Sequence, residues 1–203
     1  AVLAANQGLF LTFGIYYTII ISVIVICAKG IQMKKGKSVA VGIAFLAVAA
    51  IIMLLVFTLS GQDGSQTNML SEKVTGKIAA VVFDRFDKFS STEKEFVILE
   101  LNRFIRKCAH FGLYASMGFV IYTGTFFIFK KRLFMFLSAF LIPAIYAVTD
   151  EIHQYFVDGR TPLVTDVLID SAGALLGILT SFLIISTIRF IYWESHDPRM
   201  YLR

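Results

Sequence analysis

Residues 150–170 read DEIHQYFVDGRTPLVTDVLID, and this stretch lies between two long apolar runs. It holds five carboxylates together with a histidine, a glutamine and an arginine. We expect it to form a polar turn between two helices. Ionisable groups that border or enter membrane spans are costly and usually serve a function, so the stretch predicts a functional site.

Composition places the chain among integral membrane proteins. Hydrophobic residues make up 57% of it and charged residues only 16%, and its mean hydropathy is +0.75. Ordinary soluble domains contain about 25% charged residues. We therefore expect an all-α fold, a multi-pass transmembrane helical bundle, which forms a single domain over residues 1–203.

Five apolar runs are long enough, or nearly so, to cross a hydrocarbon core, which takes about 20 helical residues. The expected spans are Leu9–Ala28, Val39–Leu59, Cys108–Phe129, Leu133–Thr149 and Val167–Ile188. The first run lacks the charged leader and the cleavage pattern of a signal peptide, so we expect it to remain as a span. Pro143 in the fourth run removes a backbone donor and predicts a kink.

The positions of lysine and arginine in the short loops predict the orientation. Four lysines lie between the first and second runs, and residues 130–132 are all basic. We expect these loops and the C-terminus in the cytoplasm, with the N-terminus, residues 60–107 and the turn after Thr149 outside. The net charge of +5 is divided among the loops, so it does not indicate a nucleic-acid partner.

The segment before the third span has a pattern of its own. Apolar residues recur at helical spacing over residues 69–89, with charged residues between them. This pattern predicts an extracellular amphipathic helix that lies at the membrane interface or covers the site. Two overlapping capping boxes, Ser90-x-x-Glu93 and Thr92-x-x-Glu95, are able to start the next helix, which we expect to continue into the third span.

Periodicity and topology together gather polar residues at the outer ends of the spans. The expected site residues are Ser60, Gln62, Arg106, Lys107, His110, Tyr114, Asp150, Glu151, Gln154, Arg160, Asp166 and Asp170. Gly173, Ala174 and Gly177 continue the stripe of the last two carboxylates along the fifth span. Small residues at this spacing predict close packing of that span against its neighbours. His153 and Asp158 lie off the main stripe, and we interpret them as solvated loop residues.

This series of residues resembles the VanZ-like family, named for a teicoplanin-resistance protein. The resemblance covers residues 56–185. It is carried by Ser60-x-Gln62, Arg106-Lys107-x-x-His110-x-x-x-Tyr114, Asp150-Glu151-x-x-Gln154, Arg160 and Asp166-x-x-x-Asp170-x-x-Gly173-x-x-x-Gly177. Two positions depart from the family pattern: Asp170 stands where asparagine is common, and Asp158 stands where proline is frequent. The resemblance implies a protein of the bacterial plasma membrane that is linked to glycopeptide (teicoplanin) resistance.

The residue types themselves predict phosphate binding. Arg106, Lys107 and Arg160 are expected at the level of the outer headgroups, where lipid phosphates and pyrophosphates are the abundant anions. The expected partners are thus membrane lipids and an anionic lipid or lipid-linked headgroup. The residues assigned to binding are Arg106, Lys107, Arg160, Gln154, Tyr114, Ser60, Gln62 and Asp170.

A second group has the functional groups for chemistry. A histidine in this position is able to act as acid, base or nucleophile in phosphoryl transfer. Carboxylates beside it are able to orient it, to activate water, or to hold a hard divalent cation such as Mg2+. The residues assigned to catalysis are His110, Asp150, Glu151 and Asp166.

Two classes of function are compatible with such a site. One is a lipid phosphatase or phosphotransferase that acts at the outer leaflet. The other is a non-catalytic protein that binds a lipid or an antibiotic partner and whose charged cluster is mainly a structural ion-pair network. A transporter is disfavoured, because the polar residues gather at one surface rather than at the middle of the membrane.

Overall fold

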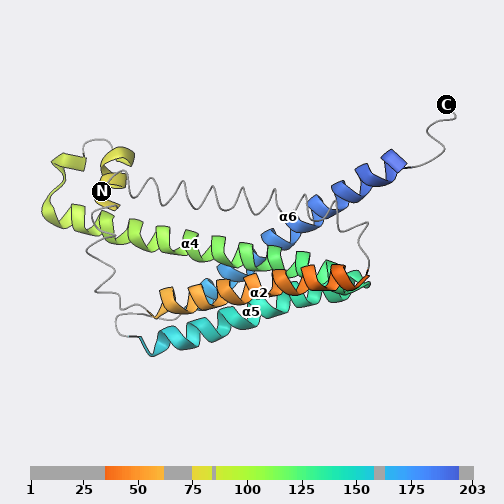
Figure 1. The fold of residues 1–203 in the computed structure, drawn as a ribbon. Coiled ribbons are helices and arrows are strands. Elements are labelled where there is room, and N and C mark those ends of the chain that lie inside the picture. Colours follow the sequence, from red (N-terminus) through yellow and green to blue (C-terminus); the bar gives the residue numbers. More distant parts are fainter. Residues whose placement is uncertain (1–34, 62–74, 84–85, 158–162, 197–203) are drawn as a thin grey trace.

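The computed structural model describes residues 35–61, 75–83, 86–157 and 163–196. Within these ranges the chain is helical and contains no strand (Figure 1). The elements are α2 Lys35–Ser60, η1 Phe86–Lys88, α4 Ser91–Ile128, α5 Arg132–Tyr155 and α6 Val164–His196. A short helical stretch over residues 75–82 precedes η1. The expected all-α fold is confirmed.

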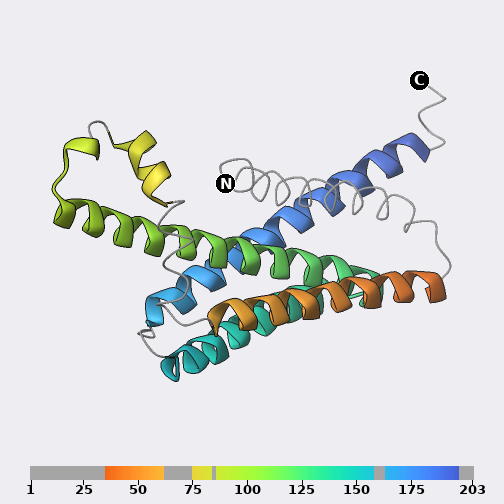
Figure 2. The ribbon, with the colours of Figure 1, turned by 60° about the vertical axis from the view of Figure 1, so that its left-hand side comes forward.

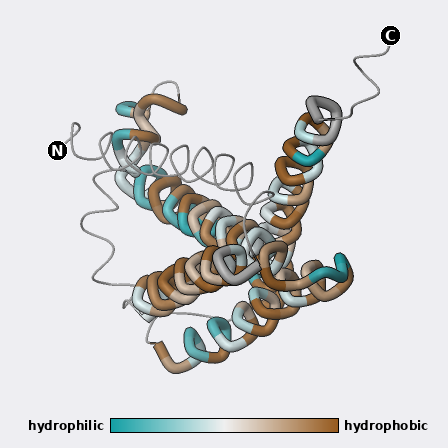
Figure 3. The backbone as a smooth tube through the Cα atoms, turned by 45° about the vertical axis from the view of Figure 1, so that its right-hand side comes forward, coloured by the Kyte–Doolittle hydropathy of each residue, from teal (hydrophilic) through white to brown (hydrophobic). Residues whose placement is uncertain are grey.

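Four of these helices are long and apolar enough to cross a membrane. They include residues 38–60 of α2, the whole of α4 and α5, and residues 164–192 of α6. Hydrophilic residues are concentrated toward helix ends and in the first half of α4 (Figure 3). The second, fourth and fifth predicted spans each lie inside one of these helices, and the third, Cys108–Phe129, ends one residue beyond α4. The first predicted span, Leu9–Ala28, lies outside the described residues.

Helix α4 is the centre of the bundle. It packs against α6, α2 and α5, and α6 crosses it at an angle (Figure 2). The α4 side chains from Tyr114 to Phe127 are mostly buried, whereas apolar side chains such as Leu54, Ile145 and Leu168 face outward on the other three helices. Outward-facing apolar surface of this kind suits contact with lipid chains.

Small residues bring the backbones of α4 and α6 into direct contact. A Cβ on Gly173 would overlap the carbonyl oxygen of Phe111 on α4, and a Cβ on Gly177 would overlap that of Ala115. In the same way, Gly118 of α4 leaves no room for a Cβ against the backbone of Ala174. Close approach through small residues is a common basis of helix packing in membranes. The close packing predicted for the fifth span is confirmed.

The two helices that flank the polar stretch are longer than their apolar runs suggest. Helix α5 continues through Tyr155, and α6 already begins at Val164. The prediction that residues 150–170 form a turn is therefore wrong in extent, because most of the carboxylates lie on the last turns of α5 and the first turns of α6. Pro143 lies inside α5, and the helix continues on both sides of it from Arg132 to Tyr155.

The start of α4 agrees with one of the two capping boxes. Ser90 is the N-cap, its hydroxyl accepts a hydrogen bond from the Glu93 backbone N–H, and the Glu93 carboxylate accepts one from the Ser90 backbone N–H. These bonds satisfy donors that the first turn of a helix otherwise leaves unpaired. The helix then continues into the span without interruption, as expected.

The amphipathic helix expected over residues 69–89 is shorter than predicted. Within the described part of this segment the helix ends at residue 82, and a separate turn, η1, follows. Thr75 hydrogen-bonds to Asn102 of α4, and Phe86 is buried, while Val81 is 86% exposed. The segment is thus attached to the first half of α4.

Candidate functional site

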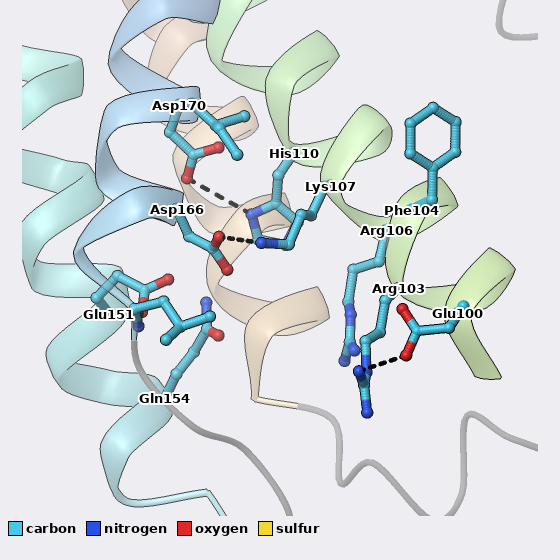
Figure 4. Close-up of a pocket in the computed structure, with 12 residues that line it drawn as sticks. Glu100, Arg103, Phe104, Arg106, Lys107, His110, Glu151, Gln154, Asp166 and Asp170 are labelled. Atoms are coloured by element: carbon cyan, nitrogen blue, oxygen red, sulfur yellow. Dashed lines mark hydrogen bonds and ion pairs between the residues drawn. The ribbon is translucent and has the colours of Figure 1, made fainter. Parts of the chain in front are cut away.

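A cavity of about 660 Å³ lies where the first half of α4 meets the end of α5 and the start of α6 (Figure 4). We call this the polar cavity. Seven of the residues predicted for the site line it: Arg106, Lys107, His110, Glu151, Gln154, Asp166 and Asp170. Residues separated by about 60 positions thus meet because the end of α5 and the start of α6 lie beside the first half of α4.

Helical spacing explains the α4 side of the cavity. Arg103, Arg106, Lys107 and His110 are separated by steps of three, one and three, so they lie on one face of the helix. All four line the cavity. Figure 4 shows Arg103 and Arg106 beside each other below Lys107, with the His110 ring directed toward Asp170 on α6.

The inner part of the site is a cluster of one histidine and two buried carboxylates. Nδ1 of His110 lies 3.9 Å from Oδ2 of Asp150 and 3.9 Å from Oδ2 of Asp170. Both carboxylate residues are 3% exposed. These distances are longer than hydrogen bonds, which rarely exceed about 3.2 Å between heavy atoms. The three groups, which we call the His110 cluster, converge without bonding tightly to one another.

Asp150 is held in place by two neighbours. The Ser60 hydroxyl at the end of α2 and the Gln154 amide one turn along α5 both donate hydrogen bonds to its Oδ2, at 2.9 and 3.0 Å. Its other oxygen, Oδ1, is buried and has no hydrogen-bond partner in the described part of the chain. Ser60 is itself fully buried and therefore serves to orient Asp150.

The remaining carboxylates have partners of a different kind. Asp166 forms an ion pair with Lys107 across the cavity, so this lysine is already engaged. Glu151 accepts a hydrogen bond of 2.8 Å from the backbone N–H of Leu163, at the start of α6. Among the described residues Arg106 has no ion pair, and its guanidinium remains available to a ligand.

Some predicted site residues lie elsewhere. Tyr114 is fully buried below the cavity beside Tyr146, and its hydroxyl has no hydrogen-bond partner among the described residues. It does not line the cavity. Gln62 and Arg160 lie outside the described residues, as does Asp158.

The interpretation of His153 as a solvated loop residue is wrong. It lies on α5, and its ring stacks on that of Phe57 with centroids 4.4 Å apart and planes at 22°. Its Nε2 is buried. The flat apolar faces of an imidazole pack well against an aromatic ring, so a polar residue type did not imply contact with water.

Five further residues of the polar cavity were not predicted. They are Glu100, Arg103, Phe104, Leu163 and Ile169. The signal for Arg103 was present, because it stands three and four residues before Arg106 and Lys107 on the same helical face. The apolar residues carried no comparable signal, since their types are common on every face of these helices.

A second cavity of about 480 Å³ lies at the opposite end of the bundle, between α4, α5 and α6. Its charged lining residues are all basic: Lys130, Arg132 and Arg189. From the sequence these residues were interpreted only as indicators of orientation. The charges around the two cavities therefore differ in kind, since basic and acidic groups face each other only in the polar cavity.

The part of the chain that matches a known protein family contains every described residue of the site. The family described as VanZ/LLP1 matches residues 45–186, which extends from the middle of α2 through α4 and α5 into the second half of α6. This range contains every described residue of the polar cavity and the glycine contacts beneath it. The comparisons with curated proteins and with solved structures found no match. Because the matched range is most of the chain and includes α4, α5 and the greater part of α2 and α6, the protein belongs to the VanZ/LLP1 family.

Proposed function

We propose that this membrane protein binds a phosphate-bearing lipid, or a lipid-linked cell-wall headgroup, in the polar cavity. The observation that carries the proposal is the basic face of α4, where Arg103, Arg106 and Lys107 line one side of the cavity. Arginine forms two parallel hydrogen bonds to phosphate oxygens, and lysine adds a point charge. Arg106 has no ion pair among the described residues and is the first candidate for this contact.

The size and position of the cavity support a headgroup as the ligand. Its volume of about 660 Å³ falls within the range of roughly 300–1,000 Å³ that is usual for small-molecule sites. It lies at the ends of membrane helices, where the headgroups of a bilayer are found. The exposed apolar surface of α5 and α6 would hold the lipid chains beside it.

We further propose that the polar cavity faces the outside of a bacterial plasma membrane. The opposite end of the bundle carries Lys130, Lys131, Arg132 and Arg189, and an excess of such residues marks the cytoplasmic side. In this orientation the cavity meets lipid-linked intermediates of the cell wall. Withdrawing or altering such a headgroup would account for a role in resistance to glycopeptides such as teicoplanin.

A phosphatase or phosphotransferase is the second candidate, and His110 is the observation that favours it. This residue lines the cavity and lies between two carboxylates, an arrangement suited to proton transfer. In hydrolysis, His110 would accept a proton from water as the water oxygen bonds to phosphorus. The bond from phosphorus to the lipid oxygen would break, and the proton would pass to that leaving oxygen.

Binding to defined membranes tests the proposal. The purified protein in nanodiscs is titrated with soluble-chain lipid phosphates and pyrophosphates, and with a neutral-headgroup lipid of the same chain length. We expect binding of the phosphate lipids and at least a tenfold weaker affinity for Arg106→Gln. Lys131→Gln, an exposed cation at the opposite end, is the matched control and should bind as the wild type does. Equal binding by Arg106→Gln, or equal binding of the neutral lipid, would overturn the proposal.

A further inference from the structure

We infer that the His110 cluster is a binding site for a divalent transition-metal ion, of the class of Zn2+ or Mn2+, at the edge of the polar cavity. The cluster consists of His110 on α4, Asp150 on α5 and Asp170 on α6. Each residue offers one donor atom, and the three donor atoms lie within 4.8 Å of one another. Three separate helices thus direct one potential ligand each toward a common point.

The spacing of the donors is close to that around a metal ion. Bonds from Zn2+ to nitrogen or oxygen are about 2.0–2.2 Å long, which places neighbouring tetrahedral ligands roughly 3.3–3.6 Å apart. Nδ1 of His110 is 3.9 Å from an oxygen of each carboxylate. A movement of a few tenths of an ångström would bring His110 to ligand spacing from each carboxylate. The donor oxygens of the two carboxylates lie within 4.8 Å of each other and would approach by at most about 1.5 Å, which side-chain rotation is able to supply.

The carboxylates of the cluster lack sufficient partners without an ion. Asp150 has one buried oxygen with no hydrogen-bond partner among the described residues, and within the same ranges the one polar partner of Asp170 is His110. The nearest lysine, Lys107, pairs with Asp166 instead. Buried charges in proteins are paired or bind metals. A divalent ion bound by a neutral imidazole would neutralise both carboxylates at once.

The charge of the cavity gives a second argument, which rests on the proposed function. The described residues that line it carry three cations, Arg103, Arg106 and Lys107, against four carboxylates. Three positive and four negative charges sum to −1, which works against the phosphate contact proposed for the basic face of α4. One bound divalent ion would reverse the sign and provide a direct contact for a phosphate oxygen, which is a common role of metal ions in phosphoryl chemistry.

The donor types indicate which metals would bind. Sites for Mg2+ and Ca2+ are built from oxygen donors, whereas imidazole nitrogen favours transition metals. The nitrogen of His110 therefore favours the class of Zn2+ and Mn2+ over Mg2+, which was one option expected for the carboxylates from the sequence. Ser60 and Gln154 would orient Asp150 from outside the ligand set, as the neighbours of metal ligands often do. His110 would then act as a ligand, and the metal ion would take over from it the activation of the attacking water.

The test measures metal directly and uses no lipid, so it is independent of the proposed function. The full chain, purified without a polyhistidine tag and stripped of metal, is titrated with Zn2+, Mn2+ and Mg2+ and then analysed for bound metal by mass spectrometry. We expect one Zn2+ or Mn2+ per chain and preference over Mg2+. His110→Ala and Asp170→Asn should lower the affinity at least a hundredfold, while the control His153→Gln should not.

A measurement on the wild type covers the case in which a variant fails to fold. A bound ion stabilises the folded state, so Zn2+ or Mn2+ should raise the Tm of the stripped protein more than Mg2+ does. No stoichiometric metal in the wild type, or equal loading of Asp170→Asn, would overturn the inference. Metal binding without lipid binding would reject the proposed ligand of the cavity and leave the metal site standing.

Discussion

Two adjacent layers of the bundle are held together in different ways. In the first, which we call the packed layer, the backbones of α4 and α6 touch through Gly118, Gly173 and Gly177. In the second, which we call the polar layer, His110 and Asp170 of the same two helices face each other at 3.9 Å without a tight bond. Backbone packing therefore sets the distance between α4 and α6, and the polar groups take the separation which this packing imposes.

The largest expected effect comes from disrupting the packed layer. Gly177→Val would place side-chain atoms where the carbonyl oxygen of Ala115 lies, and neither backbone has room to yield. We expect a loss of about 3 kcal/mol or more in stability, at the upper end for overpacked cores. Thermal unfolding in detergent, followed by size-exclusion chromatography, measures it.

Gly112→Ala is the matched control on α4, because a Cβ there would meet nothing within 4 Å. Alanine favours a helix over glycine by up to about 1 kcal/mol. This variant should therefore be as stable as the wild type or more so. Similar stabilities of Gly177→Val and Gly112→Ala would show that the α4–α6 contact does not set the spacing.

The next effect concerns the polar layer and function. His110→Ala should reduce turnover of a phosphate lipid by about 10²–10⁴, the usual consequence of removing a positioned acid or base. Protein abundance in the membrane should stay nearly unchanged, because the packed layer is intact. Turnover assays at matched protein level provide the measurement. A wild type without turnover would identify the protein as a non-catalytic binder, whereas equal turnover by wild type and variant would remove His110 from the mechanism.

A smaller effect separates a ligand site from a structural ion-pair network. Two buried carboxylates on one imidazole repel each other, so Asp170→Asn should stabilise the metal-stripped protein by about 1 kcal/mol. In a structural network the same change would remove a needed partner and destabilise the fold, by up to about 3–5 kcal/mol. The midpoint of chemical or thermal unfolding distinguishes the two signs.

The smallest expected effect is at the rim of the cavity. The ion pair of Lys107 and Asp166 is partly exposed, with side chains 37% and 26% accessible, so water weakens it. Lys107→Met should change stability by less than about 1 kcal/mol, yet weaken phosphate-lipid binding. Glu100→Gln, in an exposed pair with Arg103, should leave stability within about 0.5 kcal/mol. A large loss of stability in Lys107→Met would show that the ion pair of Lys107 and Asp166 serves mainly to stabilise the fold.

Helical periodicity predicted the parts of the fold that depend on one helix. The stripe of Asp166, Asp170, Gly173 and Gly177 was visible in the sequence because residues three and four apart share a face. The end of α5 was placed too early, since hydropathy falls at Asp150 although the helix continues. The helix is able to continue there because Ser60 and Gln154 donate hydrogen bonds to the buried carboxylate of Asp150. A hydropathy profile does not contain such contacts and places Asp150 in water.

The geometry of the site depends on how helices are rotated and spaced, and no single stretch contains that information. The sequence placed His110, Asp150 and Asp170 at one level of the membrane, but their convergence within 4.8 Å follows from contacts between three helices. His153 was misjudged for the same reason. Its partner, Phe57, lies on another helix and is nearly 100 positions away in the chain.

Helix α4 is longer than a membrane crossing requires. A helix of 38 residues extends roughly 57 Å at 1.5 Å per residue, whereas the hydrocarbon core is about 30 Å thick. Counting back about 20 residues from Ile128 reaches residue 108, beside His110. The turns of α4 before residue 108, which carry Glu100 and Arg103, are thus more than the core requires and would extend beyond it. A partner that approaches from the aqueous layer would contact these turns of α4 before it reached the polar cavity. Their length would thus set how closely such a partner comes to the cavity.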